Sequence, residues 1–384
     1  MRKNDRPEAG LVLVASLIPG VGHLLVGKRR RGIHLFVFAF GLLLLLILRW
    51  DAFVDALSSA RLAPWLSARF LAITLVASVF FSVLDTWRLL GSYGDESVGK
   101  SPFQVARRRF AENQLAMVAL YVIVFLYVIA ALAPIVAPYD PAAIENVLET
   151  RYLAPSEEHL FGTDEFGRDL FSRALYGAAV SLSIGLLAVL IAVSIGTVYG
   201  AVAGYFGGFI DNALMRIVDV VIAFPTFFLM LVLVGVFEAN IAFLVIILGL
   251  TSWTGTARFI RGEVLSLKER EFIEGARAIG LPNRLIIFRH LIPNAMAPVL
   301  VSAALMVGGM IAAEAGLSFL GIGIRPPTPS WGNMISAGQD ALLVAWWVAF
   351  FPGTLLALTI LSFNLLADGL RDALDPKTLM RKYV

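Results

Sequence analysis

The chain has 384 residues, a formal net charge of +3, 59% hydrophobic residues, 15% charged residues and no cysteine. So apolar a composition excludes a soluble globular domain and indicates a protein with several membrane spans. The small net charge gives no support for a nucleic-acid partner, and the lack of cysteine excludes disulfides and thiolate metal sites.

Runs of roughly 20 apolar residues, the length of a helix that crosses a bilayer, recur along the chain. The stretch 11–26 is shorter, contains Pro19, Gly20 and Gly22, and has basic residues at both ends. We expect a re-entrant or interfacial hairpin there rather than a span. Eight longer runs predict spans at about 33–49, 68–88, 115–137, 178–203, 214–237, 241–259, 298–320 and 343–367. The prediction is an all-α polytopic protein with six core spans and an N-terminal extension of about two more.

Charges in the loops predict the orientation of these spans. Basic residues gather before the 115–137 span, through the segment 258–289 and in the C-terminal tail. The loop 138–177 is instead acid-rich, with eight Asp or Glu against three Arg. Because Lys and Arg are enriched in cytoplasmic loops, we expect the segment 258–289 and the C-terminus in the cytoplasm and the acidic loop outside.

A polar segment, EGARAIGLPNRLIIFRHLIPN, begins at Glu274 between two apolar runs. Its four cationic or titratable basic side chains would carry a large penalty in hydrocarbon, so the segment is expected in water beside the membrane. Gly280 favours the end of a helix and Pro282 cannot continue one. The sequence therefore predicts two short helices joined by a turn.

This segment resembles the coupling loop of ABC importer permeases, in which Glu-Ala-Ala is followed at fixed spacing by Gly and by Ile-x-Leu-Pro. Glu274, Ala276, Gly280 and Pro293 fall on that spacing, whereas Gly275 replaces the first Ala. His290 stands at the Ile position and Ile292 at the Leu position. The resemblance implies an ATPase-coupling role for the loop 268–294, carried by Glu274, Ala276, Gly280, Arg289, His290 and Pro293.

Longer motifs extend the resemblance over about residues 100–378. They begin at His159 (HLFGTDEFGRDLFSRALYG), Gly204 (GYFGGFIDNALMRIVD), Ala257 (ARFIRGEVLSLKEREFIEGARAIG), Ala313 (AEAGLSFLGIGIRPPTPSWGNM) and Phe363 (FNLLADGLRDALDP). They look like the second permease subunit of dipeptide, oligopeptide and nickel ABC importers. The extension lies outside this pattern, although PGVGHLLVGKRRRG from Pro19 is similar to the Gly-rich hairpin of small two-helix membrane domains.

The resemblance implies a domain organisation and a set of partners. The fold would be a type I ABC importer transmembrane domain at 177–368, preceded by a permease region at 100–176 and an extension of unknown role at 1–95, and followed by a cytoplasmic tail at 369–384. Its partners would be a second homologous permease, two cytoplasmic ATPases that bind ATP and magnesium, an external substrate-binding protein and membrane lipid. The chain itself would be no enzyme and hold no cofactor or metal, in the cytoplasmic membrane of a bacterium or archaeon. The solute, and whether the pore is a hetero-pair or a homodimer, stay open.

Several residues outside the loop carry chemistry. Glu314 lies within an apolar run, where an acidic residue faces a cavity or a partner; a pore or subunit contact and a hydrogen bond to Ser318 or a neighbouring helix are equally favoured. In the acidic loop, Asp164, Glu165 and Asp169 fit no calcium loop and favour a capped turn that leads into an interfacial helix. The four His residues are scattered, which argues against a metal site.

Further features favour packing or capping. We expect Arg216 and Asp219 to act in interfacial ion pairs, Pro225 to kink its helix, and the glycines at 196, 200, 204, 207 and 208 to allow close helix approach. Residues 94–101 read GDESVGKS and fit a phosphate-binding loop, but Pro102 follows directly and no buried strand precedes, so a solvated linker is expected.

Two other functional classes are weighed against the importer permease. An ion-driven secondary transporter would need buried acidic or broken-helix sites at mid-membrane, for which Glu314 alone is thin support. A membrane scaffold without transport activity would leave the polar loop without a purpose. Co-purification of ATPase subunits with the chain separates these classes.

Overall fold

The computed structural model describes residues 29–49, 51–54, 102–144, 146–237 and 240–374, together with residues 71 and 74 and part of the stretch 12–25. Apart from residues 71 and 74, the 68–88 run therefore lies outside the described residues, as do the segment GDESVGKS and the end of the C-terminal tail. Within the described residues the secondary structure is helical, apart from one isolated β-bridge between Thr163 and Asp169. The chain divides into two compact units, Met1–Ser101 with Ala131–Pro138, and Pro102–Ala130 with Tyr139–Val384.

The first unit contains the described part of the extension. Helix α3 (Arg29–Leu48) forms where the 33–49 span is predicted, although its apolar part, Leu35–Ile47, is shorter than a full crossing needs. The short helix α2 (Val21–Leu25) precedes it and packs on it. Arg49 donates from Nε to the carbonyl of Ile135 and from Nη2 to that of Ala137, both at 3.0 Å. The extension is thereby bonded to the short helix α8 (Ala133–Val136) of the same unit.

The second unit contains the six core spans. Among the described residues, five helices are long and apolar enough to cross a membrane: α7 (Gln114–Ala131), α10 (Leu170–Phe206), α13 (Ile241–Leu267), the helix Asn283–Phe319 and α18 (Trp347–Leu374). The sixth is a pair, α11 (Gly208–Ile222) and α12 (Thr226–Val236), bent by 76°. The predicted kink at Pro225 is thus a complete break, because Pro225 stands just before α12 and cannot donate to the preceding turn.

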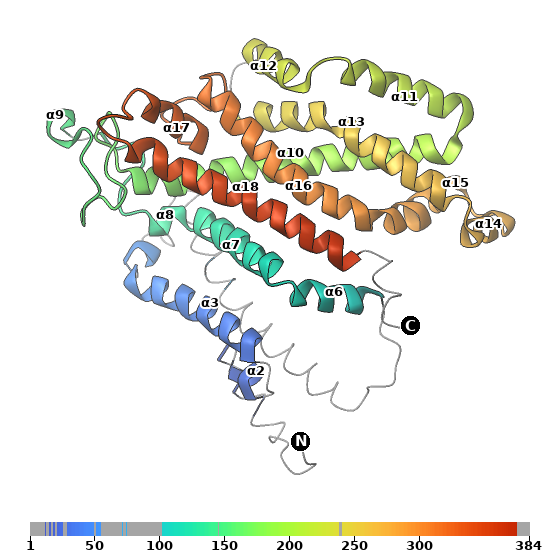
Figure 1. Ribbon diagram of the computed structural model, residues 1–384, viewed down its shortest axis with the longest axis horizontal. Coiled ribbons are helices and arrows are strands. Elements are labelled where there is room, and N and C mark those ends of the chain that lie inside the picture. Colours follow the sequence, from blue (N-terminus) through green and yellow to red (C-terminus); the bar gives the residue numbers. More distant parts are fainter. Residues whose placement is uncertain are drawn as a thin grey trace. The chain divides into compact units, whose positions relative to one another are not determined.

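Long helices of this unit lie side by side. Figure 1 shows α10 along α13 and α16 (Ile292–Phe319), and α16 along α18. The acidic loop with α9 (Val147–Thr150) and α17 (Trp331–Gln339) lies at one end of these helices, and α14 (Glu271–Ala278) lies at the opposite end. The structure therefore separates the acidic loop from the polar loop by the length of the spans.

Glycine spacing explains the close approach of α10 and α13. A Cβ atom at Gly200 would lie 2.2 Å from the carbonyl oxygen of Ala257, and one at Gly196 would lie 2.6 Å from that of Trp253. The predicted packing role holds for these two residues and for Gly204. It is wrong for Gly208, beside which a Cβ would meet nothing within 4 Å. Gly207 and Gly208 instead have φ of 65° and 53° and form the junction between α10 and α11, in a backbone conformation that glycine adopts most readily.

Candidate functional site

The polar loop forms a helix and a tight turn. Helix α14 ends at Ala278, and Gly280 follows with φ of 76°. The N–H of Gly280 donates to the carbonyl of Arg277 and that of Leu281 to Ala276, at 3.0 and 3.1 Å. These two bonds define a Schellman cap, in which a left-handed glycine closes a helix. The turn predicted at Gly280 is confirmed.

The second arm of the loop differs from the expectation. It is no separate short helix: α15 (Asn283–Leu285) runs through a π-helical turn, η1 (Ile286–Leu291), directly into the spanning helix α16. Pro293 has no N–H for the carbonyl of Arg289 and its ring crowds that carbonyl. The wider π-helical turn accommodates this proline, and the side chain of Asn294 donates to the carbonyl of His290 at 2.6 Å. Any movement of the second arm is therefore passed into α16.

One face of the loop is anchored in an apolar cluster. Ile273 and Ala276 of α14 are buried at one end of the bundle, in a cluster with Ala201, Tyr205, Ile260, Val264, Ile286, Ile287, Leu291, Ala295 and Val299. Ala276 is 5% exposed and faces this cluster rather than solvent. The cluster thus brings α14 together with residues of α10, α13, η1 and α16.

The other face of the loop is exposed. Glu274, Gly280, Arg289 and Pro293 are open to solvent, and His290 is half-buried. Beside them lie exposed apolar side chains, of which Ile279 is 77% exposed, together with Phe272 and Phe288. Exposed large apolar side chains rimmed by polar residues are a feature of protein–protein and membrane interaction surfaces. The sequence singled out the polar residues, but hydrophobicity alone could not show that these apolar ones point outward.

Two ion pairs join α11 to α13 near the same end. Arg261 donates from Nε and Nη2 to the two carboxylate oxygens of Asp211 at 2.5 and 2.6 Å. Arg258 donates from Nη2 to Asp219 at 2.5 Å. Asp219 does form an ion pair, as expected, but its partner is Arg258 and not Arg216. Bidentate geometry is the stronger form of such a pair, so α11 is fixed mainly through Asp211.

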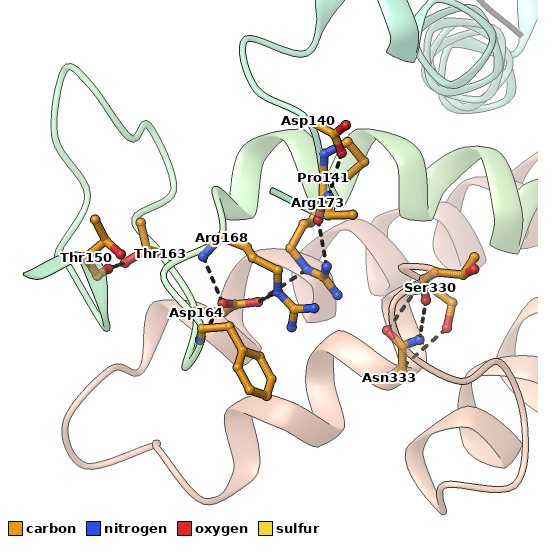
Figure 2. Close-up of polar contacts among 12 residues, drawn as sticks. Asp140, Pro141, Thr150, Thr163, Asp164, Arg168, Arg173, Ser330 and Asn333 are labelled. Carbon is orange, nitrogen blue, oxygen red and sulfur yellow. Dashed lines mark hydrogen bonds and ion pairs between the residues drawn. The ribbon is translucent and has the colours of Figure 1, made fainter. Parts of the chain in front are cut away.

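At the opposite end, the acidic loop is folded around buried charges. Asp164 accepts from the side chain of Arg168 at 2.8 Å and pairs with Arg173 at 3.4 Å, and Arg173 donates to the carbonyl of Pro141 at 2.9 Å (Figure 2). Asp169 caps α10 by accepting from the N–H of Ser172 at 2.7 Å. The predicted capped turn is confirmed for Asp164 and Asp169, whose carboxylates accept from nearby backbone N–H groups. The helix that follows is the spanning helix α10 and not the interfacial helix that was expected. The described residues contain no cluster of His, Cys, Asp and Glu that could hold a metal ion.

The carboxyl group of Glu314 is the centre of a second buried network. Ser318 donates to its Oε1 at 2.7 Å, and Ser181 of α10 donates to its Oε2 at 2.8 Å. The Oγ of Ser181 also accepts from the N–H of Trp331 at 3.3 Å. Since the side chain of Glu314 is fully buried within the chain, a pore or subunit contact is not supported in this conformation. The expected hydrogen bond to Ser318 is confirmed.

Helix α17 is held by the same network and by its own cap. Ser330 and Asn333 bond reciprocally as a capping box (Figure 2), and Asn333 also donates to the carbonyls of Ile324 and Thr328. The ring of Trp331 donates from Nε1 to the carbonyl of Ala174 at 3.1 Å. Sequence reasoning quoted the segment SWGN as a motif but missed that Trp331 and Ser181 meet, because 150 residues separate them.

The chain is thus a multi-span helical bundle of the kind that membrane permeases have. Its polar loop is anchored in an apolar cluster at one end, and its acidic loop is fixed by buried ion pairs at the other. The chain belongs to the family described as binding-protein-dependent transport system inner membrane component, which matches residues 196–380. The N-terminal TM domain of oligopeptide transport permease C matches residues 101–155. The extension at 1–95 precedes both matches.

Curated relatives support this membership over most of their length. The dipeptide transport system permease protein DppC of Bacillus subtilis (strain 168) is 42% identical over 275 residues, 71% of this chain and 85% of the relative. The glutathione transport system permease protein GsiD of Escherichia coli O157:H7 is 43% identical over 280 residues, 72% of this chain and 91% of the relative, and GsiD of Shigella sonnei (strain Ss046) matches equally.

These matches confirm the predicted family and fold class, an all-α permease of the ABC importer type in the inner membrane. The relatives are transporter permeases rather than enzymes, so the chain is a transport protein. The expected domain bounds stay predictions, but the boundaries after residues 176 and 368 fall inside the continuous helices α10 and α18.

Proposed function

We propose that the chain is one permease subunit of an ATP-driven importer that takes up peptides or related small solutes. The observation that carries the proposal is the loop 268–294, which is exposed on one face and packed against α10, α13 and α16 on the other. The solute class is supported by the relatives, named as dipeptide and glutathione permeases, because both named solutes are short peptides.

The proposed mechanism uses partner subunits for energy. Two cytoplasmic ATPases bind ATP and magnesium, and they contact the exposed face of the loop around Glu274, Ile279 and Arg289. Their closing and opening moves α14, which is packed as a rigid lever against the spans. Because the second arm continues into α16 without a break, the movement reaches the membrane helices, and alternating access follows.

The remaining partners and the orientation belong to the same proposal. A second, homologous permease completes the pore as a hetero-pair, and an external substrate-binding protein delivers the solute to the end that carries the acidic loop. The loop 268–294 and the C-terminus face the cytoplasm. Support comes from the family description, which names a binding-protein-dependent system, and from the loops' opposite ends in Figure 1.

Two substitutions in the loop test coupling. In vesicles that contain the complete complex and ATP, Glu274→Lys reverses a charge on the exposed face, and Gly280→Val opposes the positive φ of the turn. Both are expected to lower solute uptake at least about tenfold while the permease stays in the membrane. The matched control, Glu157→Lys, reverses an exposed charge in the acidic loop and should leave ATPase binding unchanged. Normal uptake by both loop variants contradicts the coupling role.

Single cysteines test the orientation, since the chain has none of its own. Cysteine at Glu157 should react with an impermeant thiol reagent added outside intact cells, whereas cysteine at Glu269 should react only after the membrane is opened. Both positions are exposed, so access by the reagent depends on the side of the membrane. Labelling of both from outside would refute the proposed orientation.

A further inference from the structure

Tyr205 touches both arms of the loop from a spanning helix. Its hydroxyl donates to Oδ1 of Asn283, the first residue of α15, at 2.8 Å. The guanidinium carbon of Arg277, in α14, lies 5.2 Å from the centroid of its ring, within the range of a cation–π contact. Arg277 precedes the turn at Gly280 and Asn283 follows it. One side chain therefore fixes the two arms relative to each other and to α10.

The bond to Asn283 differs in kind from the other contacts of the loop. The buried face of the loop packs through apolar side chains such as Ile273 and Ile286, and apolar contacts have no preferred direction. A hydrogen bond is lost when its donor and acceptor are misaligned. Among the described residues, Tyr205 to Asn283 is the side-chain hydrogen bond that joins this loop to a spanning helix. It sets the register of the loop on the bundle.

The position of Tyr205 along α10 gives this register a mechanical consequence. The helix ends at Phe206, Gly207 follows with φ of 65°, and α11 begins at Gly208. A shift of the Tyr205 ring therefore acts two residues before the junction from which α11 departs. Helix α11 is in turn tied to α13 by the ion pair of Asp211 and Arg261. The loop has a second route into the membrane through this junction, besides its continuation into α16.

We propose that Tyr205 is a positioning residue for transport: it aligns both arms of the coupling loop on α10 and passes loop movement to the α10–α11 junction. The inference rests on the proposed coupling role of the loop and names the side chain through which that role reaches α11. It requires the hydroxyl group and not only the ring, since the ring alone would pack equally well as phenylalanine.

The test uses the complete complex of both permeases, the ATPases and the binding protein in proteoliposomes. Tyr205→Phe removes the hydroxyl and keeps the ring beside Arg277. Subunit content and basal ATP hydrolysis should stay unchanged, while the amount of solute moved per ATP should fall about fivefold. Asn283→Leu should have the same effect. Asn283→Asp keeps an acceptor oxygen, so the amount of solute moved per ATP should stay near that of the unsubstituted complex. The double variant of Tyr205→Phe and Asn283→Leu should be no worse than either single variant.

A matched control removes a hydroxyl from another spanning helix. Tyr127 donates to the carbonyl of Leu182 at 3.3 Å, away from the loop, and Tyr127→Phe should leave the solute moved per ATP unchanged. A normal ratio in Tyr205→Phe, with Glu274→Lys defective, overturns the inference and leaves the coupling role intact. Normal transport in both overturns the coupling role as well. Loss of subunits from the Tyr205→Phe complex would show an assembly role and also overturn the inference.

Discussion

The two ends of the bundle are held together by different interactions. At the end with the acidic loop, buried charges and hydrogen bonds fix the backbone: Asp164 with Arg168 and Arg173, and Glu314 with Ser181 and Ser318. At the other end, the loop 268–294 rests on apolar side chains, with Tyr205 as its polar contact to a span. Directional polar networks permit one geometry, whereas apolar surfaces tolerate sliding. The acidic-loop end is therefore held in one geometry, whereas the packing of the loop 268–294 leaves room for the movement that its proposed coupling role requires.

The largest effect on stability is expected from removing a buried charge at the end with the acidic loop. Asp164→Ala removes the shared partner of Arg168 and Arg173, whose side chains are only 6% and 4% exposed. An uncompensated buried charge costs about 3–5 kcal/mol, enough to unfold the loop. Thermal unfolding of the purified chain in detergent should show a fall in Tm of several degrees. Glu165→Ala, one residue away and less buried, is the control, and an equal fall there would contradict a specific role for Asp164.

A smaller effect is expected at the second buried network. Glu314→Leu replaces the carboxyl group with an apolar side chain of similar size. The hydroxyls of Ser181 and Ser318 then have no acceptor at this position. A buried donor without a partner costs about 1–3 kcal/mol, and the loss should loosen α17 through Trp331. The measurement is thermal stability together with protease sensitivity at the 320–330 segment. Glu314→Gln, which keeps one acceptor oxygen for these hydroxyls, should lose less stability than Glu314→Leu, and an equal loss would argue against the assigned bonds.

The smallest effect is expected from an ion pair with the same spacing in an exposed setting. Arg108 and Glu112 of α6 (Pro102–Glu112) are four residues apart in the sequence and 2.9 Å apart in space, close to the 2.8 Å of the buried pair Asp164 and Arg168. The side chains of Arg108 and Glu112, however, are 66% and 57% exposed. Solvent screens such a pair, so a double-mutant cycle should give only about 0.3–0.5 kcal/mol. A coupling energy as large as that of the buried pair would show that burial does not set the difference between the two ends.

Local signals let the sequence predict much of the architecture. Apolar length predicts the six core spans, a glycine before a proline predicts the end of α14, and an aspartate before an apolar run predicts the cap of α10. Each of these is decided within a few residues, which is the range over which chain geometry and capping act. The prediction of a separate short helix for the second arm of the loop was wrong, because a π-helical turn before Pro293 lets the helix continue into α16.

The tertiary structure alone decided which side chains meet. Ser181 and Glu314 are 133 residues apart, and Tyr205 and Asn283 are 78 apart; no periodicity within one segment encodes either pair. The same holds for the inward direction of Ala276 and for the pairing of Asp219 with Arg258. By itself the sequence determined where the helices run and where they end, since hydrophobic length and backbone conformation are local properties. Their partners depended on how the helices pack, because packing brings distant segments into contact through close glycine faces and shared buried polar groups.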